Sequence, residues 1–321
     1  MRRYLAMLAA CICLVYCAVW AATELGRWHF LGPEFGMWQA KSDLLAQAGE
    51  TTPDTLVIGD SRAMAAVRPG LLPGRNVYNL ALGGGTTVEA YYVLSELAAS
   101  DALPETLVLS FAPFHLEFED AFWARTVAFR FLTPSYLLDL YARGGWRTFG
   151  KGPLEATGRY LGLPYYRVPA LRKALDEGFH GRTTRRLYRE TMTQRGWHLF
   201  GDMQAPRCLV QETALESFTP DALLTGYLKR TLEIAQDNGI DIYYVSLPYS
   251  TYNISRIRPG YLAGYRSYIA DLTDRYGAAR IATPAAVPLT MMGDCSHVNV
   301  AGAKVLTSLI AQAIRNTERA G

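Results

Sequence analysis

Apolar and polar positions divide this chain into three kinds of segment. Residues 4–22 form an apolar run without a single charge. Two later regions, about residues 54–112 and 222–316, alternate short β-branched runs with amphipathic helical patterns. Between them, residues 115–220 are rich in aromatic and charged residues and show no such alternation. The pattern predicts a membrane helix, a sheet domain and a helical insertion within that domain.

The apolar run follows Met1-Arg2-Arg3 and is 19 residues long. At about 1.5 Å per residue, a helix of this length nearly spans the roughly 30 Å hydrocarbon core of a bilayer. We interpret residues 1–25 as an uncleaved signal anchor; a cleaved signal peptide is the alternative. The paired arginines predict a cytoplasmic N-terminus, so the rest of the chain is expected outside the membrane.

The alternating regions predict five strands and the helices between them. Strands are expected at 55–58, 76–82, 106–110, 241–247 and 279–282, and helices at 223–238, 261–276 and 299–316. A further helix, with Val88, Tyr91, Leu94 and Ala98 on one face, should follow the second strand. Such alternation is typical of a three-layer α/β fold with a parallel sheet. We therefore expect a stalk at 26–53, with a short helix around 37–48, and a domain at 54–321 that carries the insertion.

Composition narrows the function classes. Half of the residues are apolar, which excludes a disordered chain, and a formal net charge of +3 argues against a dedicated nucleic-acid binder. No cysteine or histidine spacing typical of zinc and no dinucleotide or phosphate loop occurs, so we expect no metal and no cofactor. Outside the apolar run only Cys208 and Cys295 remain. They form either a disulfide or two separate thiols.

Three short motifs combine groups that could carry chemistry. Gly59-Asp60-Ser61-Arg62 follows the first predicted strand, and residues 79–85, which end in three glycines, follow the second. Residues 294–299, Asp-Cys-Ser-His-Val-Asn, precede the last predicted helix. All three lie where open α/β sheets build their sites, at strand ends and helix starts.

The motifs together suit nucleophilic catalysis. A serine hydroxyl needs a base to remove its proton, and His297 is able to do so for Ser61. Asp294, three residues earlier, is able to orient the imidazole of His297. The backbone N–H groups of Ser61 and of a glycine in the second motif could stabilise an oxyanion. Each motif alone also fits an ordinary turn or helix cap.

The order and position of the three motifs resemble the SGNH (GDSL-like) hydrolase superfamily, over about residues 54–112 and 222–316. The resemblance implies a flavodoxin-like sheet and a nucleophilic Ser61 with His297 as base and Asp294 as its partner. It also implies oxyanion donors at the N–H groups of Ser61 and Gly84, with Gly83 as the next choice. Asp60, Arg62 and Asn299 are possible substrate contacts; an ion pair of Arg62 and a helix cap at Asn299 are the alternatives.

The third strand departs from the family. Where the family usually has an asparagine as a further oxyanion donor, this chain has residues 110–115, Ser-Phe-Ala-Pro-Phe-His. His115 could supply an N–H in its place, or it is a structural histidine under the insertion. Loss of an oxyanion donor costs on the order of 100-fold in rate, so the carbonyl would be held differently or the activity would be low.

The anchor and the insertion narrow the resemblance to a membrane-bound branch of the superfamily. This branch includes the D-alanyl transfer protein of teichoic acid synthesis and acetyltransferase-like proteins of exopolysaccharide systems. It implies a bacterial, single-pass protein whose catalytic domain is periplasmic or extracellular. It also implies an acyl ester or acyl acceptor on a surface polysaccharide, and a multi-spanning O-acyltransferase as partner. A lipid or small-ester hydrolase and a non-catalytic assembly subunit are the alternatives.

Overall fold

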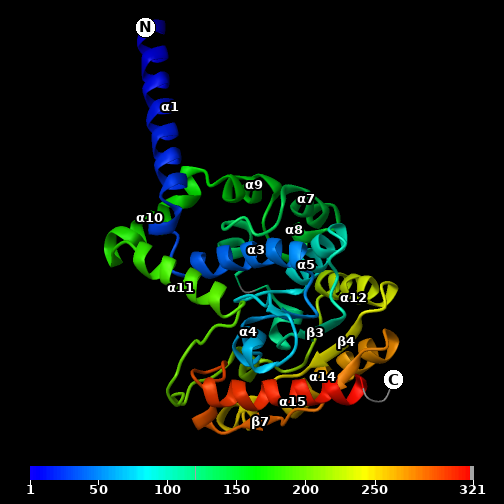
Figure 1. The fold of residues 1–321 in the computed structure, drawn as a ribbon. Coiled ribbons are helices and arrows are strands. Elements are labelled where there is room, and N and C mark those ends of the chain that lie inside the picture. The colour runs from blue at the N-terminus through cyan, green and yellow to red at the C-terminus, as the bar shows by residue number, and fades with distance from the viewer. Residues whose placement is uncertain (120, 319–321) are drawn as a thin grey trace. The chain divides into compact units, whose positions relative to one another are not determined.

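A computed structural model describes residues 1–119 and 121–318 (Figure 1). The chain forms two compact units, each made of two stretches of sequence. Unit 1 comprises Met1–Ala40 and Phe122–Glu190, and unit 2 comprises Lys41–Ala121 and Thr191–Gly321. Unit 2 contains all three motifs.

Unit 2 is built on a five-stranded parallel sheet with the order β2-β1-β3-β4-β6. This is the strand order of flavodoxin-like folds, as the resemblance implies, and the parallel α/β sheet is the one that the sequence pattern predicts. The strands are β1 (Thr55–Gly59), β2 (Val77–Asn79), β3 (Thr106–Ser110), β4 (Asp241–Val245) and β6 (Ala279–Ile281).

The central strands are buried throughout. Every residue of β1 and β3 is buried, because helices cover both faces of the sheet and near-continuous apolar runs suit that position. The last pair in their register is Gly59 opposite Ser110. A Cβ at Gly59 would lie only 2.0 Å from the carbonyl oxygen of Ser110. Glycine at this position therefore lets the chain leave the sheet directly into the Ser61 turn.

Helices cover the sheet in two layers (Figure 1). α5 packs on α12 and β1, and α12 also packs on β4 and is hydrogen-bonded to α14, so these three helices share one face. α4 and α15 pack against each other on the opposite face. Their bounds are α4 (Ser61–Ala66), α5 (Thr87–Ala99), α12 (Ala222–Asp237), α14 (Pro259–Arg275) and α15 (Val300–Glu318).

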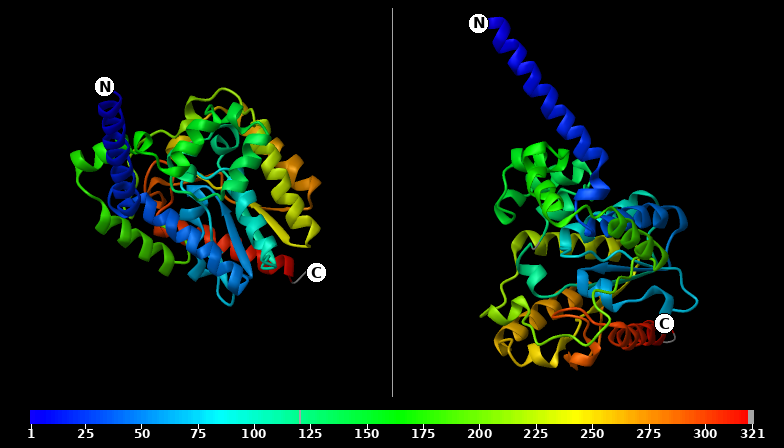
Figure 2. Two further views of the ribbon diagram at one scale, coloured as in Figure 1. Left: turned by 90° about the horizontal axis from the view of Figure 1, so that it is seen from above. Right: turned by 90° about the vertical axis from the view of Figure 1, so that its left-hand side faces the viewer.

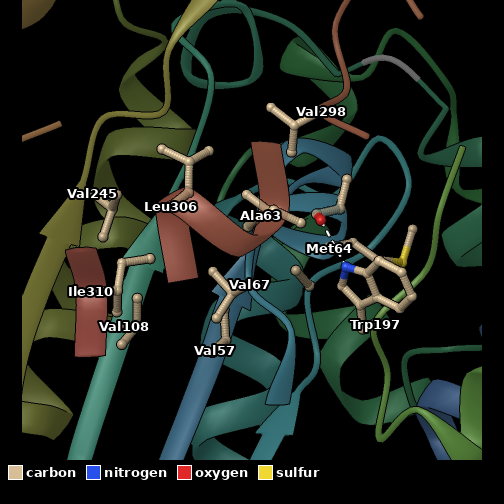
Figure 3. Close-up of a cluster of buried hydrophobic side chains, with 14 of the residues drawn as sticks. Val57, Ala63, Met64, Val67, Val108, Trp197, Val245, Val298, Leu306 and Ile310 are labelled. Atoms are coloured by element: carbon tan, nitrogen blue, oxygen red, sulfur yellow. Dashed lines mark hydrogen bonds between the residues drawn. The ribbon is translucent and has the colours of Figure 1, made fainter. Parts of the chain in front are cut away.

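The core between α15 and the sheet holds the carboxyl-terminal motif close to the first strand. Leu306 and Ile310 of α15 are fully buried and lie over Val57, Val108 and Val245 of the strands (Figure 3). Side chains four residues apart share one face of a helix, which explains this buried stripe. Burial of this kind is the main source of stability for the sheet domain.

Some predicted elements differ in extent or orientation. β2 ends at Asn79 rather than at residue 82, because the Asn79 side chain accepts a hydrogen bond from the backbone N–H of Ala81 and turns the chain. In α5 the buried face includes Tyr92 and Leu97, whereas the predicted Tyr91 and Ala98 are only half-buried. In α15, the helix predicted at 299–316, the apolar side chain of Val305 is 40% exposed.

Short elements that the sequence did not predict complete unit 2. A two-stranded parallel sheet pairs β5 with β7. The additional elements are β5 (Tyr249–Ser250), β7 (Ala286–Val287), α6 (Phe114–Glu117), α13 (Thr251–Ile254) and the short helical turns Pro69–Leu71, Gln211–Ala214 and Leu289–Met291.

Unit 1 is helical. Its helices are α1 (Arg2–Leu25), α2 (Arg27–Phe30), α7 (Pro134–Ala142), α8 (Gly145–Thr148), α9 (Pro153–Leu161) and α10 (Pro164–Glu177), with a π-helical turn at Trp123–Val127. Most of α11 (Gly181–Thr193) also belongs to unit 1, and its last three residues belong to unit 2. α3 (Glu34–Thr51) crosses the boundary between the units and is longer than the helix predicted at 37–48.

α1 projects from the other helices of unit 1, and its side chains are exposed over almost its whole length (Figure 2). Among the described residues it is the one helix that is long and apolar enough to cross a membrane. Residues 1–20 are exposed, and such an apolar surface is unfavourable in water, which is consistent with insertion of this part of the helix into a bilayer.

Candidate active site

The Ser61 turn is fixed by a buried carboxylate. Ser61 is the first residue of α4, directly after the cap residue Asp60. One oxygen of Asp60 accepts a hydrogen bond from the Arg62 N–H at 2.8 Å. The other accepts one from the Ala112 N–H, beyond the end of β3, at 2.6 Å. Because Asp60 is fully buried, its side chain holds the turn to the sheet and does not reach solvent.

Ser61, His297 and Asp294 form a continuous chain of hydrogen bonds. His297 Nε2 lies 2.7 Å from Ser61 Oγ, and His297 Nδ1 lies 2.7 Å from Asp294 Oδ2. The second oxygen of Asp294 accepts the backbone N–H groups of Ser296 and His297. These two bonds fix the carboxylate, so the imidazole is oriented with Nδ1–H toward Asp294 and Nε2 free to accept from the serine.

The environment keeps Asp294 ionised. Burial alone would raise the pKa of this carboxyl, but the hydrogen bond and charge of His297 and the two backbone N–H groups together hold the pKa below its usual value. An ionised carboxylate is the form that is able to stabilise an imidazolium at His297.

Phe200 covers one face of the candidate base. Its ring stacks on the His297 imidazole with centroids 3.9 Å apart and planes inclined by 19°. The next residue, Gly201, lies against Gly293, and a Cβ on either glycine would come within 2.2 Å of the other's carbonyl oxygen. The two glycines therefore allow the segment that carries Phe200 to reach the His297 loop.

The His297 loop is cross-linked to the far end of the predicted insertion. Cys208 and Cys295 are bonded as a disulfide with their Cα atoms 5.2 Å apart. Asn253 donates a hydrogen bond to the Cys295 carbonyl at 3.0 Å and accepts one from the Val210 N–H at 3.3 Å. The disulfide and the Asn253 side chain thus both attach the loop between Asp294 and His297 to parts of the chain outside the main sheet.

The glycine turn lies close to the start of the Ser61 turn. The Leu82 N–H donates to the Gly59 carbonyl at 3.0 Å, and a Cβ at Gly85 would lie 3.0 Å from the same oxygen. Gly84 adopts a positive φ of 72°, which favours glycine. Within the described residues, the backbone N–H groups of Ser61 and Gly84 donate no hydrogen bond. Gly83, in contrast, already interacts with another group of the protein.

Arg62 lies in a buried ion pair. Its guanidinium is 2.9 Å from Glu212 and lies over the ring of Tyr249, 4.4 Å from the centroid. Tyr249 also donates a hydrogen bond to the same oxygen of Glu212. Burial disfavours the charge on Arg62, but Glu212 opposes this effect and the pKa of the guanidinium is raised. The pair ties α4 to the short helical turn Gln211–Ala214.

Asn299 and His115 complete the residues singled out in the sequence. Asn299 caps α15: its oxygen accepts the N–H groups of Ala301 and Gly302, and its amide donates to the Thr290 carbonyl. His115 follows β3 and is only 9% exposed. Within the described residues, its Nδ1 has no hydrogen-bond partner.

A cavity opens at the carboxyl ends of β3, β4 and β6. Its volume is about 250 Å³. Arg62 forms part of its wall, together with Ser246, Tyr249, Tyr265 and Arg266. The wall is therefore mixed, with hydroxyl groups and cationic side chains among apolar ones. In the part of the chain that the structure describes, no group of three or more His, Cys, Asp or Glu side chains is arranged to hold a metal ion.

Sequence reasoning missed Phe200 and Glu212, in the last part of the predicted insertion, and Asn253, beyond it; all three support the candidate site. None belongs to a recognisable motif, and each acts on a residue far away in the sequence. Gly201 and Gly293 were visible in the sequence, but a glycine does not by itself reveal which part of the chain packs against it.

Comparisons with known proteins identify no family for this chain. No family model matches the chain, and no curated protein matches it. Among solved structures, one match is a protein of Bacteroides fragilis NCTC 9343 described as a "putative acylhydrolase". It is 13% identical, with 85% of this chain and 94% of that chain covered, at a TM-score of 0.39. A likeness this weak carries no argument about activity.

Proposed function

We propose that this protein is a membrane-anchored serine enzyme that forms an acyl-enzyme on Ser61 and passes the acyl group to a hydroxyl or to water. The observation that carries the proposal is the continuous hydrogen-bonded chain from Ser61 through His297 to Asp294. Its order and distances are those that let a weak nucleophile lose its proton during attack.

In the first half of the reaction, Ser61 Oγ attacks the carbonyl carbon of an ester and its proton moves to His297 Nε2. The carbonyl oxygen becomes an oxyanion, for which the free N–H groups of Ser61 and Gly84 are the candidate donors. When the ester bond breaks, His297 returns the proton to the leaving alcohol, and the acyl group remains on Ser61. Asp294 stabilises the imidazolium in between.

In the second half, an acceptor hydroxyl or a water molecule gives its proton to His297 and attacks the acyl-enzyme. Collapse of the second oxyanion frees Ser61, which regains its proton from His297. Transfer and hydrolysis differ only in which acceptor reaches the acyl group, so exclusion of water from the site decides between them.

Membrane anchoring by α1 favours an acyl acceptor at the cell surface. With α1 in the membrane and Arg2 and Arg3 on the cytoplasmic side, the catalytic unit is periplasmic or extracellular. An oxidising compartment on that side suits the disulfide between Cys208 and Cys295. We infer that the acyl group, such as acetyl, belongs to a surface polysaccharide, as the resemblance to the anchored SGNH branch implies.

Labelling with a fluorophosphonate probe tests the proposal. The full-length protein in detergent micelles should be labelled on one serine, and Ser61→Ala should abolish the labelling. Ser296→Ala is the matched control, because Ser296 also lies beside His297, with Oγ 3.4 Å from Nδ1. That variant should keep most of the labelling rate. A folded wild-type protein that the probe does not label would contradict the proposal and favour a non-catalytic subunit.

A further inference from the structure

The start of α10 is attached to the end of the apolar helix in unit 1. The indole N–H of Trp20, in the last turns of α1, donates to the Leu161 carbonyl, just before α10, at 3.1 Å. One helical turn further on, Glu24 binds Arg130 at 2.7 Å and Arg167 of α10 at 3.3 Å. Arg167 is almost fully buried, so this contact is part of the packed interior of unit 1.

The other end of α10 is attached to the segment that follows α1. The His180 N–H donates to the His29 carbonyl at 2.7 Å. Gly181 lies against the ring of His29, where a Cβ would come within 2.4 Å of Nδ1. Residues 20–29 therefore hold α10 at its first turn and just beyond its end, and α10 lies beside the base of α1 (Figures 1 and 2).

α10 turns an apolar face to the outside. Tyr165, Val168 and Leu175 are 76%, 56% and 67% exposed. They are three and seven residues apart, which places them on one side of a helix. Arg167 and Ala174 on the opposite side are buried. Beyond the two ends of the helix, exposure of apolar side chains continues at Leu161 and Phe179.

Exposed apolar side chains that gather on one side of a helix are typical of a surface that contacts a partner or a membrane. Its attachment to α1 identifies that partner. Trp20 lies near the end of the apolar run, at the level where tryptophan prefers the boundary between lipid and water. Leu161 is bonded to Trp20 and therefore lies at the same level. The apolar face of α10 therefore lies next to α1, a helix whose own apolar surface requires lipid.

We propose that the apolar face of α10, made of Tyr165, Val168 and Leu175, lies in the interfacial layer of the bilayer that α1 spans, so that unit 1 contacts lipid through two helices. The charged residues nearest the apolar side, Arg172 and Asp176, form an exposed ion pair at 3.9 Å, which suits the polar headgroup layer. Arg172 shares the apolar side and is long enough to place its guanidinium among headgroup phosphates. Lys173 and Glu177 lie away from that face, toward water. The inference rests on membrane anchoring by α1.

Depth-dependent quenching in nanodiscs tests the inference. The background is the full chain with Cys11→Ala, Cys13→Ala and Cys17→Ala, in which the disulfide between Cys208 and Cys295 is kept. Single cysteines at Tyr165, Val168 and Leu175 are labelled with the fluorophore NBD. Lys173→Cys and Glu177→Cys are the matched controls on the same helix, and Val15→Cys in α1 is the membrane reference.

We expect lipids with a spin label near the headgroup to quench NBD at positions 165, 168 and 175 on the order of 2-fold, with a blue-shifted emission. Positions 173 and 177 should show neither effect. Quenching at Val15 alone would overturn the inference and leave the anchor intact. Absence of quenching at Val15 as well, also by lipids that carry the spin label in the acyl chain, would show that α1 is not in the bilayer, which contradicts the anchored form of the proposed function.

Two further outcomes would also overturn the inference. Equal quenching at all five α10 positions would mean that no particular face meets the lipid. A blue shift at 165, 168 and 175 that needs no lipid quencher, and disappears when the protein is diluted to one copy per nanodisc, would mean that a second copy covers the face.

Discussion

The two sides of the candidate site are held in different ways. Ser61 is fixed by the sheet, because Gly59 ends β1 and the buried Asp60 bonds the turn to the chain beyond β3. His297 lies in a loop outside the strands of the main sheet, and a disulfide, an asparagine side chain and the stacked Phe200 hold this loop. We therefore expect the loss of Asp60 on the Ser61 side to affect folding, and side-chain changes at Asp294 and Phe200 on the His297 side to affect mainly the rate. Loss of the disulfide should affect both.

The largest effect on rate is expected for Asp294→Asn. An amide neither selects the required tautomer of His297 nor stabilises its cation, so ester turnover should fall about 10³- to 10⁴-fold. The readout is hydrolysis of p-nitrophenyl acetate, with the exposed Asp237→Asn as control. A loss below 10-fold would show that Asp294 does not support a catalytic histidine.

On the Ser61 side, Asp60→Ala should reduce the free energy of unfolding by about 3 kcal/mol or more. The change leaves two buried N–H groups, those of Arg62 and Ala112, without their charged acceptor. Urea denaturation of the detergent-solubilised protein measures the effect. Unchanged stability with lost activity would contradict the contrast between the two sides.

Removal of the disulfide tests the other side of the comparison. The double variant Cys208→Ser, Cys295→Ser should lose about 2 to 4 kcal/mol of stability, because the bridge closes a long loop. Its turnover should also fall at temperatures where it stays folded, since the His297 loop is freed. The double variant Cys11→Ser, Cys13→Ser is the matched control. Full activity of the Cys208/Cys295 variant would show that the other contacts are enough to position the His297 loop.

A smaller effect is expected for Phe200→Leu. The aliphatic side chain fills part of the space but loses the stacking contact on His297, a contact worth about 0.5 to 1.5 kcal/mol. The maximal rate should fall several-fold with little change in KM. Phe118→Leu, at a partly exposed phenylalanine of the same unit, should change neither value. A raised KM with unchanged maximal rate would instead place Phe200 against the substrate.

The smallest effect concerns acid stability. Because folding lowers the pKa of Asp294, its contribution to stability is complete above the unfolded value of 3.8 and is lost as the pH falls through the lower folded value. Between pH 5 and pH 2, wild type should therefore lose stability more steeply than Asp294→Asn. Parallel urea midpoints for the two proteins over this range would contradict the assigned direction.

Most of the fold was predictable because its signals are local. The β-branched runs of β1 and β3 and the apolar stripe of α15 are visible in short windows of sequence, and a parallel α/β sheet follows from their alternation. The extent of β2 was wrong, because the Asn79 side chain ends the strand within an otherwise suitable run. The small sheet of β5 and β7 was missed, because strands of two residues have no periodicity to detect.

The chemical groups of the candidate site were likewise visible as residue types: a serine after the first strand, three glycines after the second, and Asp294 and His297 before the last helix. Only the tertiary structure brings Ser61 within 2.7 Å of a histidine 236 residues away. Only packing places Phe200 on the imidazole and joins Cys208 to Cys295, a bond that the sequence left open. Periodicity and motif order act within one element, whereas such contacts depend on how distant elements pack, and no local pattern records that.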